Sequence, residues 1–449
     1  MYQLVIKNGM IVDPVEGQYL ANIGINNGQI SKISNSDIIG RETLDATGKK
    51  ISPGFIDIHM HEDKLNNGKI EFEVFNYMVK MGVTTVVGGN CGLGECNIAE
   101  YLNCLQKNGS PVNYLGLIGH NSLREEVACL DNYQQATAKQ IDRMKEILRD
   151  CLDKGGSGLS FGLEYIPGTS LDELLSLCRV VKDSGKIVAV HYRFDGRRSL
   201  EALAEMIIVA KETGVRFQVS HLGSCIAFGQ MEAGLAMLEA ANQAGIDIMA
   251  DVYPYDSFCT YIGSAVFDKG CFKNWDVGYN AIEMAEGKYG GQRCTEEIFN
   301  YVRENEADKL AIAFVMNEEE VVKAMKHPLV MIASDALINK GKGHPRSAGT
   351  FPRVLGKYVR ETGELGFISA INKMTMMPAE RLGLSSKGRI KEGYDADLIV
   401  FDFNSIAEQA TFKNPALAPA GIKSVILGGS KVVDNGVLTG EKPGYPIRN

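Results

Sequence analysis

Six side chains that can bind a metal ion follow short apolar segments typical of buried β-strands. They are His59, His61, Cys91, His191, His221 and Asp335. His59 and His61 are two residues apart, so on one strand their side chains would point to the same face. The chain has seven histidines, and four of them belong to this set. Imidazole, thiolate and carboxylate are the ligands that zinc accepts, and the set therefore predicts a zinc site.

The segments that must position these side chains are eight apolar β runs, which alternate with stretches of helical periodicity. The runs lie at residues 55–58, 84–87, 114–118, 158–161, 187–190, 217–219, 246–249 and 330–333. Alternating strands and helices indicate an α/β fold, and eight such units favour a closed parallel (β/α)8 TIM-type barrel. An open, doubly wound parallel sheet is the alternative. In a barrel the carboxyl ends of the strands surround the active site, and the six side chains lie at such ends.

Two of the expected helices carry start signals. Thr137 with Gln140, and Ser170 with Glu173, have the spacing of capping boxes in front of apolar stripes. Each stripe repeats every three to four residues, so one face of each helix is expected to pack on the barrel.

Both ends of the chain differ in pattern from the middle. Short β runs separated by Asn-Gly and Asp-Pro pairs fill residues 1–52, and similar runs fill residues 387–449. Such pairs are typical of hairpin turns, so Asn8-Gly9 is expected to separate two strands. We predict that the two ends form one small β-sandwich domain outside a barrel of residues 53–386. The stretch 256–328 is too long for an ordinary connection and predicts an inserted segment or lid.

The composition narrows the class of protein and of partner. The net charge is −8, and a negative field repels phosphate groups, so neither nucleic acid nor a membrane surface is expected as a partner. A run of about 18 apolar residues, which would indicate a membrane-spanning helix, does not occur. The first residues lack the basic and apolar blocks of a signal peptide. Ten cysteines in such a chain are expected to be reduced, and the prediction is a cytoplasmic protein.

Several longer segments resemble one enzyme family. Residues 53–61 (PGFIDIHMH) and 388–402 (GRIKEGYDADLIVFD) resemble the metal-binding and closing segments of the amidohydrolase superfamily. Four further segments resemble the D-aminoacylase, or N-acyl-D-amino-acid deacylase, family: 82–92 (GVTTVVGGNCG), 162–168 (GLEYIPG), 251–255 (DVYPY) and 344–356 (HPRSAGTFPRVLG). The resemblance covers essentially the whole chain and implies a barrel with a β-sandwich.

The resemblance also implies a role for each candidate ligand. The tighter of one or two zinc ions would be held by Cys91, His191 and His221. A second position would be lined by His59, His61 and Asp335, with Cys91 as the bridge. Related cyclic-amide hydrolases use a carbamylated lysine after the fourth strand, and this chain has none there. Asp335 would take a proton from the attacking water and pass it to the leaving nitrogen, as general base and then acid.

The activity implied by the resemblance is hydrolysis of a linear amide, most simply deacylation of an N-acyl-D-amino acid. The carboxylate of such an anionic substrate is a partner for arginine and tyrosine side chains. Arg346 and Tyr255 are the candidates by resemblance, and Arg193 and Tyr165, which follow the fifth and fourth runs, are further candidates. The family carries a lysine two residues after the sixth-strand histidine, where this chain has Gly223. The carboxylate must then be bound in another way, or the substrate differs.

Two alternatives remain open at this point. The same barrel could hydrolyse cyclic amides or dipeptides, as dihydroorotases, hydantoinases and isoaspartyl dipeptidases do. A barrel without activity could instead serve as an assembly or binding module, although buried ionisable groups are costly without a metal ion. Barrels of this kind often associate, so a homo-oligomer is compatible with the sequence.

Overall fold

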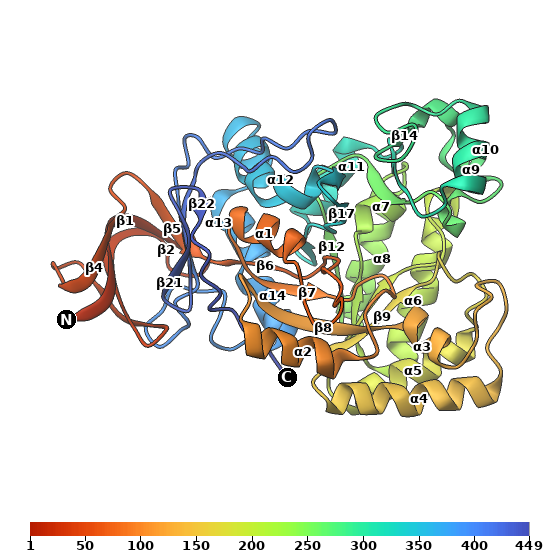
Figure 1. Cartoon of the computed structure of the whole chain (residues 1–449), viewed down its shortest axis with the longest axis horizontal. Coiled ribbons are helices and arrows are strands. Elements are labelled where there is room, and N and C mark those ends of the chain that lie inside the picture. The colour runs from red at the N-terminus through yellow and green to blue at the C-terminus, as the bar shows by residue number, and fades with distance from the viewer. Residues whose placement is uncertain (449) are drawn as a thin grey trace.

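The computed structural model describes residues 1–448 (Figure 1). Its centre is a parallel sheet of eight strands: β6 (Phe55–Asp57), β7 (Val83–Gly88), β8 (Asn113–Gly119), β9 (Gly158–Gly162), β10 (Ile187–His191), β11 (Arg216–Val219), β12 (Ile248–Val252) and β16 (Val330–Ile332). The strands lie side by side in chain order, which confirms the predicted barrel. The seventh strand begins two residues later than the run expected at 246–249.

The first and last strands close the barrel without a regular ladder. Met60 and Ala336 form a single parallel bridge, and the Asp335 N–H donates to the His59 carbonyl at 2.8 Å. The buried Asp57 carboxylate accepts a further bond from the Ser334 N–H at 3.0 Å. The closure therefore fixes the ends of β6 and β16, which carry three candidate ligands, against each other.

The helices of the barrel follow their strands, and their apolar faces cover the sheet. They are α1 (Glu73–Lys80), α2 (Ile98–Asn108), α3 (His120–Glu126), α4 (Ala138–Asp153), α5 (Leu171–Asp183), α6 (Ser199–Thr213), α7 (Leu222–Ile226), α8 (Met231–Gln243), α11 (Glu318–Lys326), α12 (Arg346–Arg353), η4 (Val354–Glu361), α13 (Phe367–Met374) and α14 (Met376–Leu382). Both predicted helix starts are confirmed. Thr137 and Gln140 form the complete capping box of α4, and the Ser170 side chain accepts the Glu173 N–H at the start of α5.

Strands from both ends of the chain form one nine-stranded sheet beside the barrel (Figure 1). They are β1 (Tyr2–Asp13), β2 (Gly17–Asn26), β3 (Gln29–Ser34), β4 (Gly40–Asp45), β5 (Lys50–Pro53), β19 (Leu398–Phe401), β20 (Ile422–Leu427), β21 (Ser430–Asp434) and β22 (Val437–Leu438). β5 pairs with β1 on one side and with β19 on the other, and so joins the two ends.

The expected hairpin at Asn8-Gly9 is wrong, because β1 continues through this pair. The pairing of β1 with β2 shifts register there, and Asn8 adopts a left-handed φ of 62°. A side chain at Gly9 would collide with Ile51, since a Cβ atom would lie 2.3 Å from Ile51 Cδ1. The pair therefore makes a bulge in β1 that lets the neighbouring strand β5 approach closely.

The stretch 256–328 contains a small antiparallel sheet in the order β13 (Phe258–Tyr261), β15 (Leu310–Ala313), β14 (Ile282–Met284), with α9 (Cys271–Trp275) and α10 (Glu296–Asn305) beside it. Asp195, which follows barrel strand β10, accepts hydrogen bonds from Asn274 Nδ2 and Trp275 Nε1, both at 2.6 Å. These bonds hold the insertion over the carboxyl ends of the barrel strands. The domain boundaries at residues 52/53 and 386/387 stay a prediction.

Two further observations bear on the class of protein. Within residues 1–448, a helix with the length and hydrophobicity needed to span a bilayer is not found. All ten cysteines have free thiols, as the sequence predicts. Any special role for a cysteine must therefore come from its surroundings.

Candidate metal centre

The six predicted ligands lie together at the carboxyl ends of the barrel strands. They form two clusters that share one thiol: His59, His61, Cys91 and Asp335 in one, and Cys91, His191 and His221 in the other. Within each cluster the ligand atoms lie within 4.8 Å of one another. The Cys91 Sγ atom is 3.4 Å from Nε2 of His59 and 3.4 Å from Nε2 of His221. This geometry offers two neighbouring metal positions with the thiol between them.

Three of these residues have a backbone conformation that side-chain-bearing residues rarely adopt. The φ angle is 54° at Cys91, 33° at His221 and 49° at Asp335. Each lies in the turn that follows a barrel strand, and a left-handed conformation costs on the order of 1–3 kcal/mol. Strain of this kind concentrates at functional sites, because the surrounding fold must hold it. The turns here direct the three side chains to one place.

The imidazole rings are oriented by partners on their other nitrogen. Glu164 lies 2.8 Å from His191 Nε2 and Ser224 lies 2.8 Å from His221 Nδ1, both at hydrogen-bond distance. Asp251 lies 3.3 Å from His59 Nδ1, as an ion-pair contact without the geometry of a hydrogen bond. Metal-binding histidines typically have such a partner, which fixes the ring and its tautomer. The opposite nitrogen of His191, Nδ1, is buried and has no hydrogen-bond partner among residues 1–448. It is the atom left free to bind a metal ion, so these residues fit zinc.

The charges in the two clusters favour an ionised thiol. Burial raises the pKa of Cys91, but His59 and His221 outweigh this effect and hold the pKa well below its usual value. Burial lowers the pKa of His61, but Asp335 and Cys91 raise it to about 9. For His191, Cys91 and Glu164 likewise overcome burial and raise the pKa to about 10. A divalent cation that binds this thiolate would displace the protons of the surrounding imidazolium groups.

Asp335 connects the second metal position to a buried guanidinium group. Its Oδ1 atom is 3.1 Å from His61 Nε2, and its Oδ2 atom is 2.8 Å from Arg346 Nη2. The Arg346 Nε atom also donates to the Asp335 carbonyl at 2.7 Å. Burial raises the pKa of Asp335, but Arg346 and His59 hold it well below its usual value. The carboxylate is therefore ionised and fixed in position.

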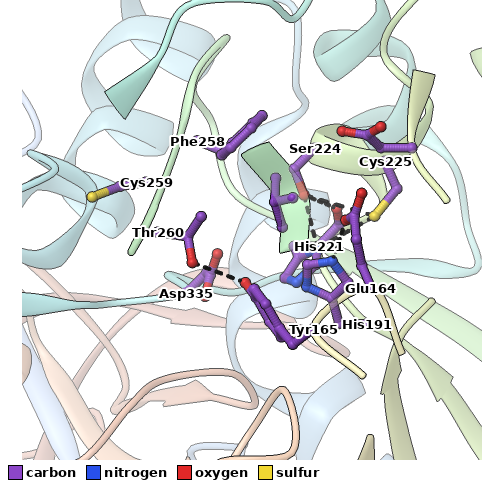
Figure 2. A pocket seen from close by; sticks show the side chains of 12 residues that line it. Glu164, Tyr165, His191, His221, Ser224, Cys225, Phe258, Cys259, Thr260 and Asp335 are labelled. Carbon is purple, nitrogen blue, oxygen red and sulfur yellow. Dashed lines mark hydrogen bonds and ion pairs between the residues drawn. The ribbon is translucent and has the colours of Figure 1, made fainter. Parts of the chain in front are cut away.

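A narrow cavity, open to solvent on one side, lies against both clusters (Figure 2). The barrel contributes Glu164, Tyr165, His191, His221 and Asp335 to its lining, and the insertion contributes Phe258, Cys259, Thr260 and Val266. Glu164, Ser224 and Cys225 lie on one side of the histidines, and Phe258, Thr260 and Asp335 lie on the other (Figure 2). Because the insertion forms part of the wall, a small molecule in the cavity would touch both it and the metal ligands.

Two of the four residues predicted to bind substrate lie at this cavity or directly behind it. Tyr165 lines the cavity, and its hydroxyl is 3.1 Å from Thr260 Oγ1. Arg346 lies behind Asp335, with 1% of its surface exposed. Its Nη1 atom has no partner in the described chain. These two groups remain candidates for contact with a substrate.

The other two point elsewhere. Arg193 is held by the Glu205 carboxylate, with both nitrogen–oxygen distances 3.0 Å. The Tyr255 hydroxyl donates to Glu408 at 2.6 Å. Neither residue lines the cavity, because each side chain meets a carboxylate outside it.

Gly223, where the family carries a lysine, does not face the cavity either. A Cβ atom at this position would lie 3.1 Å from Val252 Cγ2 and 3.2 Å from Met316 Cε. Helix α7 turns this position toward packed apolar side chains, and it turns Ser224 and Cys225 toward the cavity instead. The chain therefore lacks the family's lysine, and a side chain at position 223 would meet apolar residues and not the cavity.

Sequence reasoning missed the groups that orient the imidazoles, namely Glu164, Ser224 and Asp251. The rule that found the ligands could also have found two of them, because Glu164 follows the fourth run and Asp251 follows the seventh. The partner of His221 was not, since Ser224 reaches Nδ1 only because α7 begins directly after the histidine.

The chain is similar to known proteins over most of its length. The chain matches the sequence model of the amidohydrolase family over residues 51–432. It is 33% identical to the N-acyl-D-glutamate deacylase of Alcaligenes xylosoxydans xylosoxydans, over 96% of this chain and 93% of that protein. Identity to the D-aminoacylase of the same organism is 30%, over 99% and 97%.

The chain is also similar to a solved structure over its whole length. The crystal structure of N-acyl-D-glutamate deacylase from Bordetella bronchiseptica, complexed with zinc and a phosphonate inhibitor, matches with a TM-score of 0.89 and 28% identity over 100% of both chains. The family match and the two relatives each span most of the chain. The chain therefore belongs to the amidohydrolase family, on its D-aminoacylase branch, and is a metal-dependent enzyme that acts on amide C–N bonds.

Proposed function

We propose that this enzyme uses zinc to hydrolyse the linear amide bond of an N-acyl-D-amino acid, which releases a carboxylate and a free D-amino acid. The observation that carries the proposal is the pair of ligand clusters that share Cys91 beside the cavity. The Cys91 thiolate, which both clusters share, would take the place of the lysine that the cyclic-amide branch uses after the fourth strand, where this chain has Glu164. The deacylase relatives support the same branch.

The ligands bind the metal ions, and Asp335 also transfers a proton. Cys91, His191 and His221 would hold the tighter zinc ion, and His59, His61 and Asp335 would line the second position. Zinc, when bound, supplies Lewis acidity, which lowers the pKa of water and polarises an amide carbonyl. Asp335 accepts the proton of the attacking water and then delivers it to the leaving nitrogen, because an unprotonated amine anion does not depart.

Two donors remain for the substrate. The Tyr165 hydroxyl faces the cavity, and Arg346 Nη1 is the one nitrogen of that guanidinium without a partner in the described chain. Arg346 also keeps Asp335 ionised at neutral pH, through the 2.8 Å contact with its Oδ2 atom. We assign both residues to binding and positioning.

A hydrolysis screen tests the proposal. Zinc-loaded and metal-stripped enzyme are given N-acetyl, N-formyl and N-succinyl derivatives of D- and L-amino acids, with hydantoins and dihydroorotate beside them. Free amine is measured for the linear amides, and the ring-opened N-carbamoyl product is measured for the cyclic ones. We expect release from D-derivatives only, and only with zinc. Activity confined to cyclic amides would assign the chain to the other branch. A protein that neither binds zinc nor hydrolyses any amide would be a binding module.

We also assign the enzyme to the cytoplasm. Ten free thiols suit a reducing compartment, where disulfides are rare. Fractionation of the source cells with an antibody to the chain tests this assignment, and recovery outside the cytoplasm would contradict it.

A further inference from the structure

One wall of the cavity carries two carboxylates. Glu164 and Asp195, here called the acidic wall, both line this cavity together with the ligand His191. Among residues 1–448, those that line this cavity include neither lysine nor arginine. A substrate side chain that points at this wall, away from the metal ligands, therefore meets the carboxyl groups and neither lysine nor arginine.

The two carboxyl groups of the acidic wall differ in how many of their oxygens accept a hydrogen bond. Both oxygens of Asp195 accept hydrogen bonds from the insertion, one from Asn274 and one from Trp275. Glu164 uses only Oε2, which lies 2.8 Å from His191 Nε2. No hydrogen bond within the described chain reaches Glu164 Oε1, and 13% of the side chain is exposed. One carboxylate oxygen at the wall is thus open to a donor from the substrate.

The arginines close to the cavity are already paired with carboxylates. Arg193 is neutralised by Glu205, and Arg346 by Asp335. Position 223 faces apolar side chains, so it offers no place for a cation. A carboxylate in the substrate side chain would therefore lie against the acidic wall without a partner, at an electrostatic cost.

We propose that the preferred N-acyl-D-amino acid has a basic side chain, and that its ammonium or guanidinium group binds Glu164. This inference rests on the proposed function and adds the substrate class. The basic side chain would donate a hydrogen bond to Glu164 Oε1 and neutralise the carboxylate, while Oε2 continues to accept from His191 Nε2. The preference would set this enzyme apart from the relative named for N-acyl-D-glutamate.

The experiment measures kcat/KM of the zinc-loaded enzyme for side chains of similar length. The panel is N-acetyl-D-lysine, N-acetyl-D-arginine, N-acetyl-D-norleucine, N-acetyl-D-glutamine and N-acetyl-D-glutamate. A charge-assisted hydrogen bond predicts that lysine exceeds norleucine by about tenfold or more. Glutamine is expected to exceed glutamate, because the two differ only in charge.

Variants of Glu164 identify the group responsible. Glu164→Gln keeps the shape and removes the charge, so the lysine-to-norleucine ratio should fall close to one. Glu164→Asp keeps the charge and should retain part of the preference. The ratio is measured on one preparation, so a loss of active enzyme does not affect it. Glu146→Gln removes an exposed carboxylate of α4, 62% exposed, and should leave the ratio unchanged.

Two results would overturn the inference. An adjoining outer cavity, which shares Glu164 and Asp195 with the first, also contains Lys269. If glutamate exceeds glutamine and lysine, a cation such as Lys269 dominates and the basic preference is wrong, although deacylation stands. If no N-acetyl-D-amino acid is hydrolysed at all, the proposed function fails and the inference fails with it.

Discussion

Asp335→Asn separates metal binding from proton transfer more cleanly than any other single change. The asparagine side chain keeps one oxygen, which can accept from Arg346, but its amide cannot take a proton from water. Cys91, His191 and His221 are unaffected, so the tighter zinc position stays complete. We expect one zinc ion to be retained while turnover collapses.

The expected size follows from the contacts of Asp335. General acid–base catalysis contributes about 10²–10⁴-fold, so kcat should fall by this factor. The variant also leaves the Arg346 guanidinium, which is 1% exposed and 2.8 Å from Oδ2, without its counter-charge. Loss of one partner from a buried ion pair costs about 3–5 kcal/mol, and the remaining oxygen should keep the cost near 3 kcal/mol. The variant should therefore fold with a lower melting temperature.

Three measurements on the same preparation distinguish a loss of proton transfer from a loss of metal binding or of folding. Single-turnover hydrolysis gives the rate, elemental analysis gives the zinc content, and thermal unfolding gives the stability. Asp142→Asn, which removes a carboxylate of α4 that is 71% exposed, is the matched control and should resemble the wild type. Near-normal kcat in Asp335→Asn would refute the assignment of the proton carrier. Loss of all zinc together with the activity would refute the separation of the two roles.

Three further predictions concern the metal and the terminal sheet. Asp251→Asn removes the charge beside His59 Nδ1 and should weaken zinc binding at the second position by about tenfold or more in chelator competition, and unchanged affinity would contradict it. Removal of zinc with a chelator should abolish hydrolysis and lower the melting temperature, with recovery on zinc but not on magnesium, because the site lacks the all-oxygen ligands that magnesium prefers. Burial raises the pKa of Asp13, but Arg389 and nearby N–H groups hold it below its usual value. Its ionised form therefore stabilises the fold above pH about 4 and this contribution is lost as the pH falls. Asp13→Asn should cost about 3 kcal/mol at pH 7 and less near pH 2, measured by urea unfolding, and an equal loss at both pH values would contradict it.

The barrel could be predicted from the sequence because each strand is a short run of apolar residues followed by a helical period. The ligands were found by the same route, since a polar residue that ends such a run must lie at one face of the barrel. His59 and His61 are the clearest case, because strand periodicity alone puts them on one side. The barrel and its ligand clusters thus follow from local patterns.

Other features depend on contacts between distant segments, which local patterns do not encode. The insertion pairs β13 with β15 across about fifty residues of intervening chain, and no alternation in the sequence specifies that partner. Tyr255 was assigned to the substrate, yet its hydroxyl meets Glu408, more than a hundred residues later in the chain. Asn8-Gly9 has the composition of a turn, but the space needed by Ile51 makes it a bulge.

The bond from Trp275 to Asp195 has an optical consequence. The chain contains a single tryptophan, and its indole ring lies edge-on to Phe258, a cavity residue, at a centroid distance of 5.6 Å. All indole fluorescence of the protein therefore originates beside two residues that line the cavity, Phe258 and Asp195. A ligand that displaces Phe258, or an insertion that lifts and exposes the indole N–H to water, would shift the emission, so binding can be followed in real time without any label.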